Sequence, residues 1–378
     1  MDYYLPPAVA LTGFSRTWCR EGRGNSGSAV TASLRRRWPS IRVAAFSPDA
    51  GFVRDGAPDT STPERPDARF HLPDATDAGS FLRHLDEARA AVPFEAIVPL
   101  LDTEVGVLYE LREELRDRGV LVLLPERHAY ERSRPEALPD LAREAGVPMP
   151  ETFVARTGAE EADAVFWAGA HLARRSGALF VKRPFERAVR VAHVETARVA
   201  IRAAFARGNG QGPVLVQEAL EGIETVGVLA VGNGKGGLFA SGTIRKPFLS
   251  PLGRFRPGVT LNDPGLNRTV AALLRTLRWN GPIEIEFLRD LRGTFHLLAI
   301  HPCFPGWAYL PSLFGCNLTA LALYHLTQSQ GGREVVIPPQ PALPHGRMVP
   351  LCPEKEEVRL PAPAPVPIFM EGEEPCLF

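Results

Sequence analysis

Cysteine is scarce in this sequence and follows no pattern. The five cysteines are Cys19, Cys303, Cys316, Cys352 and Cys376. They include no Cys-x-x-Cys pair, which argues against a disulfide framework and a cysteine zinc site, so we expect a reducing cytoplasm. No stretch approaches the roughly 18 apolar residues that a membrane helix needs. The first eleven residues have no positive start and no long apolar run, so we expect no secretory signal.

A surplus of charge is also lacking. The 378 residues include 43 basic and 43 acidic side chains. This balance argues against a nucleic-acid partner, which usually requires a basic excess or stripe, and against a polybasic membrane binder. The apolar fraction of 45% is typical of a folded globular chain. At about 100–200 residues per domain, we expect two or three structural units.

Lysine is the scarcest of the charged residues. The four lysines are Lys182, Lys235, Lys246 and Lys355, and the other 39 basic residues are arginines. A lysine in such a chain indicates a position where a compact ammonium is favoured over the planar fork of arginine.

The first 125 residues alternate between strand and helix patterns. Apolar runs at 8–11, 41–46, 96–101 and 120–124 predict strands, and helical spacing appears at 29–38, 81–91 and 105–118. This alternation predicts a parallel sheet with helices on both faces, and binding at the carboxyl ends of its strands. No Gly-x-Gly-x-x-Gly turn follows the first strand, which argues against a nicotinamide dehydrogenase. Asp102 and Glu104, after the strand at 96–101, either line a cleft between domains or begin a helix.

The region from 126 to about 330 mixes hairpins with helices and therefore predicts an α+β domain. The expected helices are 135–145, 159–176, 197–207, 263–279 and 317–328. Strands are expected at 152–155, 178–182, 190–193, 214–218, 283–289 and 294–301, with a hairpin over 224–244. Prolines cluster beyond 331, so residues 331–378 predict an extended, polyproline-like tail. The tail is either a strap on the body or a docking segment for a protein partner.

Four segments of this second region have residues suited to a nucleotide. They are 179–184 (LFVKRP), 214–224 (VLVQEALEGIE), 243–248 (TIRKPF) with two arginines soon after, and 281–307, which contains GPIEIEF and LLAIHPCFPGW. A lysine on a strand suits a triphosphate because a compact ammonium neutralises phosphate charge. Apolar walls with a few polar groups suit an adenine ring. Each segment taken alone also fits a solvated strand end, a half-buried strand or a surface loop.

Taken in order, these segments resemble the ATP-grasp fold, the fold of carboxylate–amine ligases, from about residue 125 to residue 326. The resemblance implies an N-terminal parallel α/β domain at 1–125, then an ATP-grasp domain at 126–330 and the Pro-rich tail at 331–378. The ATP-grasp domain would consist of a small lid, at about 150–218, and an antiparallel-sheet subdomain. The implied reaction phosphorylates a substrate carboxylate with ATP, and an amine then displaces the phosphate from the acyl phosphate.

The resemblance also implies which residues bind ATP. They are Arg134, Lys182, Gln217, Glu218, Ala219, Leu220 and Glu224. Lys182 would reach the phosphates, with Arg134 at the place of the family's first lysine. Gln217 would face the exocyclic amine of adenine, and Glu224 would accept from the ribose hydroxyls. Glu218 and Ala219 would offer backbone groups, and Leu220 would pack on the ring.

The catalytic cations and the metal ligands are implied in the same way. Lys246, Arg245 and Arg254 would bind a phosphate or a substrate carboxylate. Glu286 would be the first metal carboxylate, with Glu284 and His301 as further ligands of magnesium or manganese.

Residues 299–303 depart from the family pattern. They read AIHPC where the family has Glu-x-Asn-Pro-Arg. Ala299 has no donor atom in place of the expected glutamate, and magnesium prefers oxygen ligands to the nitrogen of His301. Cys303 cannot replace a guanidinium that stabilises a transferring phosphate.

Two hypotheses remain open. In the first, the chain is a working ligase that joins small-molecule or peptide carboxylate and amine substrates, using ATP and magnesium or manganese. In the second, it is a degenerate member, a pseudoenzyme that acts as a partner or regulatory subunit. A homodimer is compatible with either hypothesis.

Overall fold

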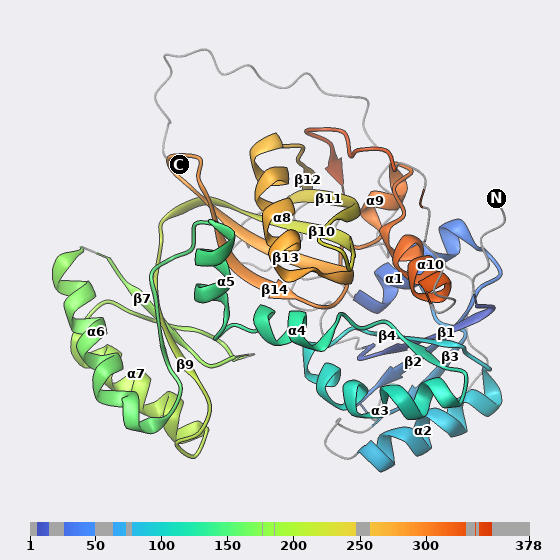
Figure 1. The fold of residues 1–378 in the computed structure, drawn as a ribbon, viewed down its shortest axis with the longest axis horizontal. Coiled ribbons are helices and arrows are strands. Elements are labelled where there is room, and N and C mark those ends of the chain that lie inside the picture. Colours follow the sequence, from blue (N-terminus) through green and yellow to red (C-terminus); the bar gives the residue numbers. More distant parts are fainter. Residues whose placement is uncertain are drawn as a thin grey trace.

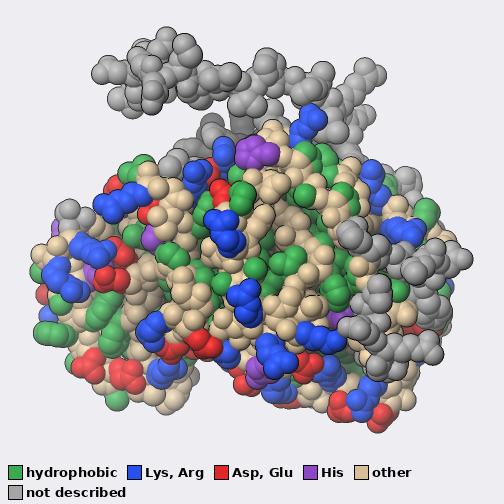
Figure 2. Space-filling view, turned by 45° about the horizontal axis from the view of Figure 1, so that its top comes forward, with side chains coloured by type: hydrophobic (Ala, Val, Ile, Leu, Met, Phe, Trp, Pro, Cys, Tyr) green, Lys and Arg blue, Asp and Glu red, His purple; other side chains and the backbone are tan. Residues whose placement is uncertain are grey.

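The computed structural model describes residues 6–14, 26–49, 63–72, 78–175, 177–184, 186–246, 258–329, 337 and 340–349. These residues form one parallel and two antiparallel sheets with helices packed around them (Figure 1). The predicted architecture, a parallel α/β part followed by mixed α/β with antiparallel sheets, is confirmed. Among the described residues, no helix has the length and apolar character to cross a membrane. On the face shown in Figure 2, basic and acidic side chains lie interspersed.

The N-terminal part is a five-stranded parallel sheet in the order β3-β2-β1-β4-β5. Its strands are β1 (Ala8–Thr12), β2 (Arg42–Ser47), β3 (Ala68–His71), β4 (Ala96–Pro99) and β5 (Leu121–Val122). Its helices are α1 (Ser26–Arg37), α2 (Ala78–Ala91) and α3 (Val105–Asp117), the last preceded by the 3-10 turn η3 (Asp102–Glu104). Because strand side chains alternate between faces, Val9 and Leu11 pack on the side of α1, whereas Ala8 and Ala10 pack on the side of α2 and α3.

The lid is a four-stranded antiparallel sheet in the order β6-β9-β7-β8. The strands are β6 (Thr152–Ala155), β7 (Leu179–Lys182), β8 (Val189–Val191) and β9 (Val214–Glu218). The 3-10 turn η4 (Gly158–Glu160) leads into α6 (Glu161–Arg174), which lies with α7 (Val194–Arg207) against one face of this sheet (Figure 1). These two helices do not cover the other face of the sheet.

The largest sheet has six strands in the order β14-β13-β10-β11-β12-β15, all antiparallel. They are β10 (Gly222–Asn233), β11 (Leu238–Lys246), β12 (Gly258–Thr260), β13 (Asn280–Asp290), β14 (Phe295–His301) and β15 (Met348–Val349). Helix α8 (Pro264–Leu277) covers one face. The short α9 (Leu310–Leu313) and α10 (Leu318–Ser329) pack on the other, between this sheet and α1.

One helix was not expected from the sequence. The helix expected at 135–145 is α5 (Leu138–Ala145), and a further helix, α4 (Arg127–Ser133), precedes it. The backbone of Arg134 is extended (φ −65°, ψ 147°) because a residue before proline is disfavoured in the helical region, which separates the two helices at Pro135. Strand β15, in the predicted tail, was not expected either. It pairs with β12, so residues 340–349 lie along the sheet edge, which agrees with the strap alternative for these residues.

Candidate functional site

The lid contributes Lys182 through strand alternation in β7. Leu179 and Val181 are buried against α6 and α7, so Phe180 and Lys182 point to the opposite face of the sheet. The Lys182 Nζ donates to Gln217 Oε1 at 3.0 Å. The Gln217 Nε2 in turn donates to Thr152 Oγ1 at 3.0 Å. The β7–β9 register pairs Phe180 with Gln217, which makes Lys182 and Gln217 diagonal neighbours on one face.

Lys182 also interacts electrostatically with a residue of the six-stranded sheet. Burial lowers the pKa of the Lys182 ammonium, and the charge of Glu286 opposes that shift. The Glu286 carboxylate is therefore close enough to Lys182 to act on it electrostatically. The two predicted residues, from different sheets, thus interact through their charges.

The side chains of Glu284 and Glu286 on β13 share one face of their sheet through strand alternation, as Lys182 does on β7. Ile283, Ile285 and Phe287 are buried against α8, so Glu284 and Glu286 point to the other face of the six-stranded sheet. The register pairs Glu284 with His301 and Glu286 with Ala299 across β14.

Lys246 lies between these two carboxylates. Its Nζ donates to Glu284 Oε1 at 2.7 Å and also to Glu286 Oε1. The same Glu284 oxygen accepts from the Trp307 indole Nε1 at 3.0 Å. Burial lowers the pKa of Lys246, but the two carboxylates outweigh it and raise the pKa above its ordinary value. The lysine is therefore charged at neutral pH.

A glycine opens the route of this lysine across the sheet. Lys246 is on β11, whereas Glu284 and Glu286 are on β13, and β10 runs between them. On β10, Gly227 pairs with Glu286 on one side and with Ile244 on the other. A Cβ at Gly227 would lie 2.6 Å from Lys246 Cε, too close for two carbon atoms. The side chain of Lys246 therefore crosses β10 where a side chain is missing.

His301 connects this group to the N-terminal sheet. Its Nδ1 lies 3.0 Å from the Oδ2 of Asp102, in the turn that follows β4. Burial lowers the pKa of His301, but the hydrogen bond and charge of Asp102, with the charges of Glu284 and Glu286, raise it to about 9. At neutral pH this side chain is an imidazolium. Asp102 thus faces the neighbouring domain, one of the two roles expected from the sequence.

Cys303 is buried beside Asp102. Burial first, and then the carboxylate of Asp102, raise the pKa of its thiol well above the ordinary value. A protonated thiol is a poor nucleophile and a poor metal ligand.

These residues do not fit a pair of magnesium ions. Within the described part of the chain, no three His, Cys, Asp or Glu side chains are grouped so as to hold a metal ion. Glu284 and Glu286 are ion-paired with Lys246, and Ala299 has no donor atom. The Nδ1 of His301 is engaged with the Oδ2 of Asp102 at 3.0 Å.

Other residues with implied roles are engaged elsewhere. Arg245 and Lys246 are consecutive on β11, so their side chains point to opposite faces. Arg245 Nε contacts Glu224 Oε2 at 2.5 Å, and Arg289 contacts Glu224 Oε1 at 3.2 Å. Glu224, implied to hold a ribose, is thus neutralised by two arginines. Arg254 lies outside the described residues.

Most of the residues expected to bind adenine, and Arg134 at the place of the family's first lysine, also contact other protein groups, as Arg245 and Glu224 do. The side chain of Glu218 is paired with Arg175. The backbone N–H groups of Glu218 and Ala219 donate to the carbonyls of residues 151 and 178, at 2.8 and 2.9 Å. Leu220 is partly exposed. Arg134 Nε lies 2.9 Å from Glu136 Oε1.

Sequence reasoning missed three residues that build the group: Thr152, Gly227 and Trp307. Trp307 carried a weak signal, because a buried tryptophan usually needs a partner for its N–H. Gly227 had a signal in its position inside a strand, where glycine often marks a close approach.

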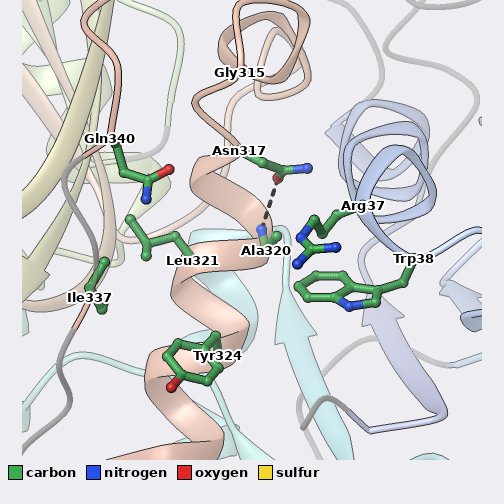
Figure 3. A pocket seen from close by; sticks show the side chains of 9 residues that line it. All are labelled: Arg37, Trp38, Gly315, Asn317, Ala320, Leu321, Tyr324, Ile337 and Gln340. Carbon is green, nitrogen blue, oxygen red and sulfur yellow. Dashed lines mark hydrogen bonds between the residues drawn. The ribbon is translucent and has the colours of Figure 1, made fainter. Parts of the chain in front are cut away.

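A cavity of about 120 Å³ lies elsewhere, between the end of α1, α10 and the two residues Ile337 and Gln340 (Figure 3). Arg37 stacks over the Trp38 ring at its rim, 5.3 Å from the ring centroid. Its lining residues include none of the residues implied in ATP binding, metal binding or catalysis.

Comparison with known proteins identifies the fold. No family model matches the sequence, and no curated protein matches it at a significant level. Similar solved structures include a biotin carboxylase from Campylobacter jejuni (TM-score 0.62, 13% identity, covering 88% of this chain and 72% of that one). They also include an N5-carboxyaminoimidazole synthetase from Staphylococcus aureus (TM-score 0.59, 10% identity, covering 92% of this chain and 82% of that one). A third is an L-amino acid ligase from Bacillus licheniformis (TM-score 0.56, 13% identity, covering 86% of this chain and 75% of that one). The fold expected from the four sequence segments is confirmed.

Proposed function

Because the chain has the ATP-grasp fold, we propose that it binds ATP between the lid sheet and the six-stranded sheet. One observation carries the proposal: Lys182 of the lid, hydrogen-bonded to Gln217, lies within electrostatic reach of Glu286, which Lys246 joins to Glu284 on the large sheet. Ammonium groups removed from solvent attract phosphate more strongly than exposed ones, because the local dielectric is low. Two scarce lysines at one place, in a chain that otherwise uses arginine, support a phosphate site.

The reaction class we propose is the ATP-dependent joining of a carboxylate to an amine. An oxygen of the substrate carboxylate attacks the γ-phosphorus and the bond to ADP breaks. The amine nitrogen then attacks the acyl carbon, phosphate leaves, and the nitrogen loses a proton. Lys182 would bind the phosphates and Lys246 would neutralise the adjacent carboxylates. The lid would exclude water, because an acyl phosphate hydrolyses easily.

A second candidate is a nucleotide-binding partner or regulatory subunit without turnover. A specific observation favours it: the acidic side of the site is neutralised by Lys246 and lacks a donor at Ala299. Losing one electrostatic contribution to a transition state costs about 2.7–4 kcal/mol, roughly 100- to 1000-fold in rate. In this candidate the Pro-rich tail at 331–378 would dock the partner.

Thermal unfolding with ATP tests the binding proposal. ATP at 100 times its dissociation constant should stabilise the fold by about 2.7 kcal/mol. Lys182→Met should weaken ATP binding by about 10- to 100-fold, since a hydrogen bond to a charged group contributes about 1.5–3 kcal/mol. The matched control is Lys235→Met, in the turn between β10 and β11, which should bind ATP as the wild type does. No stabilisation at millimolar ATP, or equal losses in both variants, would overturn the proposal.

Release of ADP separates the two candidates. If ADP appears only when a carboxylate and an amine are both supplied, the chain is a ligase. If ATP stabilises the fold but mixtures of carboxylic acids and amines release no ADP, the second candidate holds.

A further inference from the structure

We propose that the ammonium of Lys246 is a built-in replacement for a divalent cation, so that this protein binds its nucleotide without magnesium. The inference deepens the proposed function and rests on it for the nucleotide. The part that concerns the two carboxylates stands on their geometry alone. It assigns Lys246 a structural role as the counter-ion of Glu284 and Glu286.

The contacts of Lys246 are those of a bridging cation. One nitrogen contacts an oxygen of Glu284 at 2.7 Å and an oxygen of Glu286. The indole N–H of Trp307 donates to the same Glu284 oxygen at 3.0 Å. The carboxylate face that a metal ion would need is therefore occupied by two N–H donors.

The backbone is shaped for this arrangement. Gly227 leaves the space through which the lysine side chain reaches across β10, and a Cβ there would also lie 3.3 Å from Lys246 Nζ and from Glu284 Oε1. The side chains of Lys246 and Glu284 are only 24% and 9% exposed. Glu284 is buried and Glu286, 33% exposed, lies beside it, so the pair needs a cation because unpaired buried charges are costly. Lys246 supplies that cation within the chain.

The residue opposite Glu286 in the sheet also fits the proposal that Lys246 replaces a divalent cation. Ala299 is paired with Glu286 in the β13–β14 register, so no third carboxylate adds negative charge at this point. The ammonium of Lys246 is therefore shared by two carboxylates rather than three.

Manganese binding to the nucleotide-free protein tests the carboxylate part. The free Mn²⁺ signal in electron paramagnetic resonance reports how much ion the protein takes up. The wild type should bind Mn²⁺ weakly, whereas Lys246→Met removes the ammonium shared by Glu284 and Glu286 and should bind it at least about tenfold more tightly, as one 1.4 kcal/mol interaction is worth tenfold. Lys235→Met removes a lysine in the turn between β10 and β11, at the far end of the hairpin from Lys246, and is the matched control, with wild-type Mn²⁺ binding.

If Lys246→Met folds poorly, Lys246→Gln provides the same test, because it keeps a polar side chain beside the two carboxylates but removes the charge. Mn²⁺ should raise the melting temperature of this variant and not that of the wild type. Equal Mn²⁺ affinity in wild type and Lys246→Met, or tight binding to the wild type, overturns the inference. This measurement contains no ATP, so it can fail or succeed independently of the proposed function.

The nucleotide part is tested by ATP affinity in excess EDTA and in excess Mg²⁺. The two dissociation constants should agree within about threefold for the wild type, less than one factor of ten in the equilibrium constant. A tenfold or greater loss of affinity in EDTA would show that the protein needs the metal. Absence of ATP binding in both conditions would instead refute the proposed function and leave the manganese result standing.

Discussion

Between pH 6 and pH 9 this protein should lose stability, and replacing Asp102 with asparagine should reduce that loss. His301 donates to Asp102 over 3.0 Å, and its pKa in the folded chain is raised from 6.5 to about 9. A raised pKa means that the folded state holds the proton more tightly than the unfolded state. The resulting stabilisation is fully present below pH 6.5 and is lost as the pH rises through about 9.

The size of the effect follows from the shift and from solvent exposure. One pKa unit corresponds to about 1.4 kcal/mol, so the whole shift sets an upper limit of roughly 3 kcal/mol. The His301 side chain is 38% exposed, and solvent screens such a pair to about 1 kcal/mol. We therefore expect the wild type to lose about 1 kcal/mol of unfolding free energy over this range beyond what Asp102→Asn loses.

Urea unfolding at pH 6, 7.5 and 9 measures this difference. Asp263→Asn is the matched control, because Asp263 caps α8 by accepting from the Leu266 N–H at 2.9 Å, a role that asparagine fills equally well, and this contact includes no histidine. That variant should keep the wild-type profile from pH 6 to 9. Parallel profiles for wild type and Asp102→Asn would refute the reasoning.

Two further substitutions test the packing that positions the site. Trp279 is fully buried and donates to the Pro282 carbonyl at 2.9 Å, so Trp279→Ala should cost about 3–5 kcal/mol of unfolding free energy. Trp279→Phe should cost less, about 1–3 kcal/mol for the carbonyl left without its donor; equal losses in urea unfolding would contradict the cavity argument. Asp263 caps α8 by accepting from the Leu266 N–H at 2.9 Å, so Asp263→Ala should cost about 1 kcal/mol, most of it recovered in Asp263→Ser. A fully stable Asp263→Ala protein, measured by its melting temperature, would rule out that contribution.

Local alternation in the sequence was enough to predict which way several site residues point. The segment IEIEF at 283–287 sends its carboxylates to one face and its apolar side chains to the other, and LFVK at 179–182 does the same for Lys182. Helix α4 was not predicted, and the predicted helix at 135–145 began at Pro135, whereas α5 begins at Leu138, because a proline indicates a break without saying how much helix precedes or follows it.

The partners of those residues depended on contacts between distant parts of the chain. Lys246 is 40 residues from Glu286, and Asp102 is 199 residues from His301. Strand register determines which of these side chains meet, and a register shift of one residue would reverse every face. The sequence offered cations and carboxylates of the right kinds, but it did not show that Glu224 would be paired with Arg245 and Arg289.

The sequence by itself determined the ATP-grasp fold, the alternation that points Lys182, Glu284 and Glu286 away from their apolar neighbours, and the loss of a donor at Ala299. These follow from residue type and period, which are local properties. Only the tertiary structure decided that Lys246 crosses β10 at Gly227 to hold both carboxylates, and that Asp102 keeps His301 charged. Those outcomes require three strands and two domains to be packed together, because electrostatic pairing depends on distance in space and on burial.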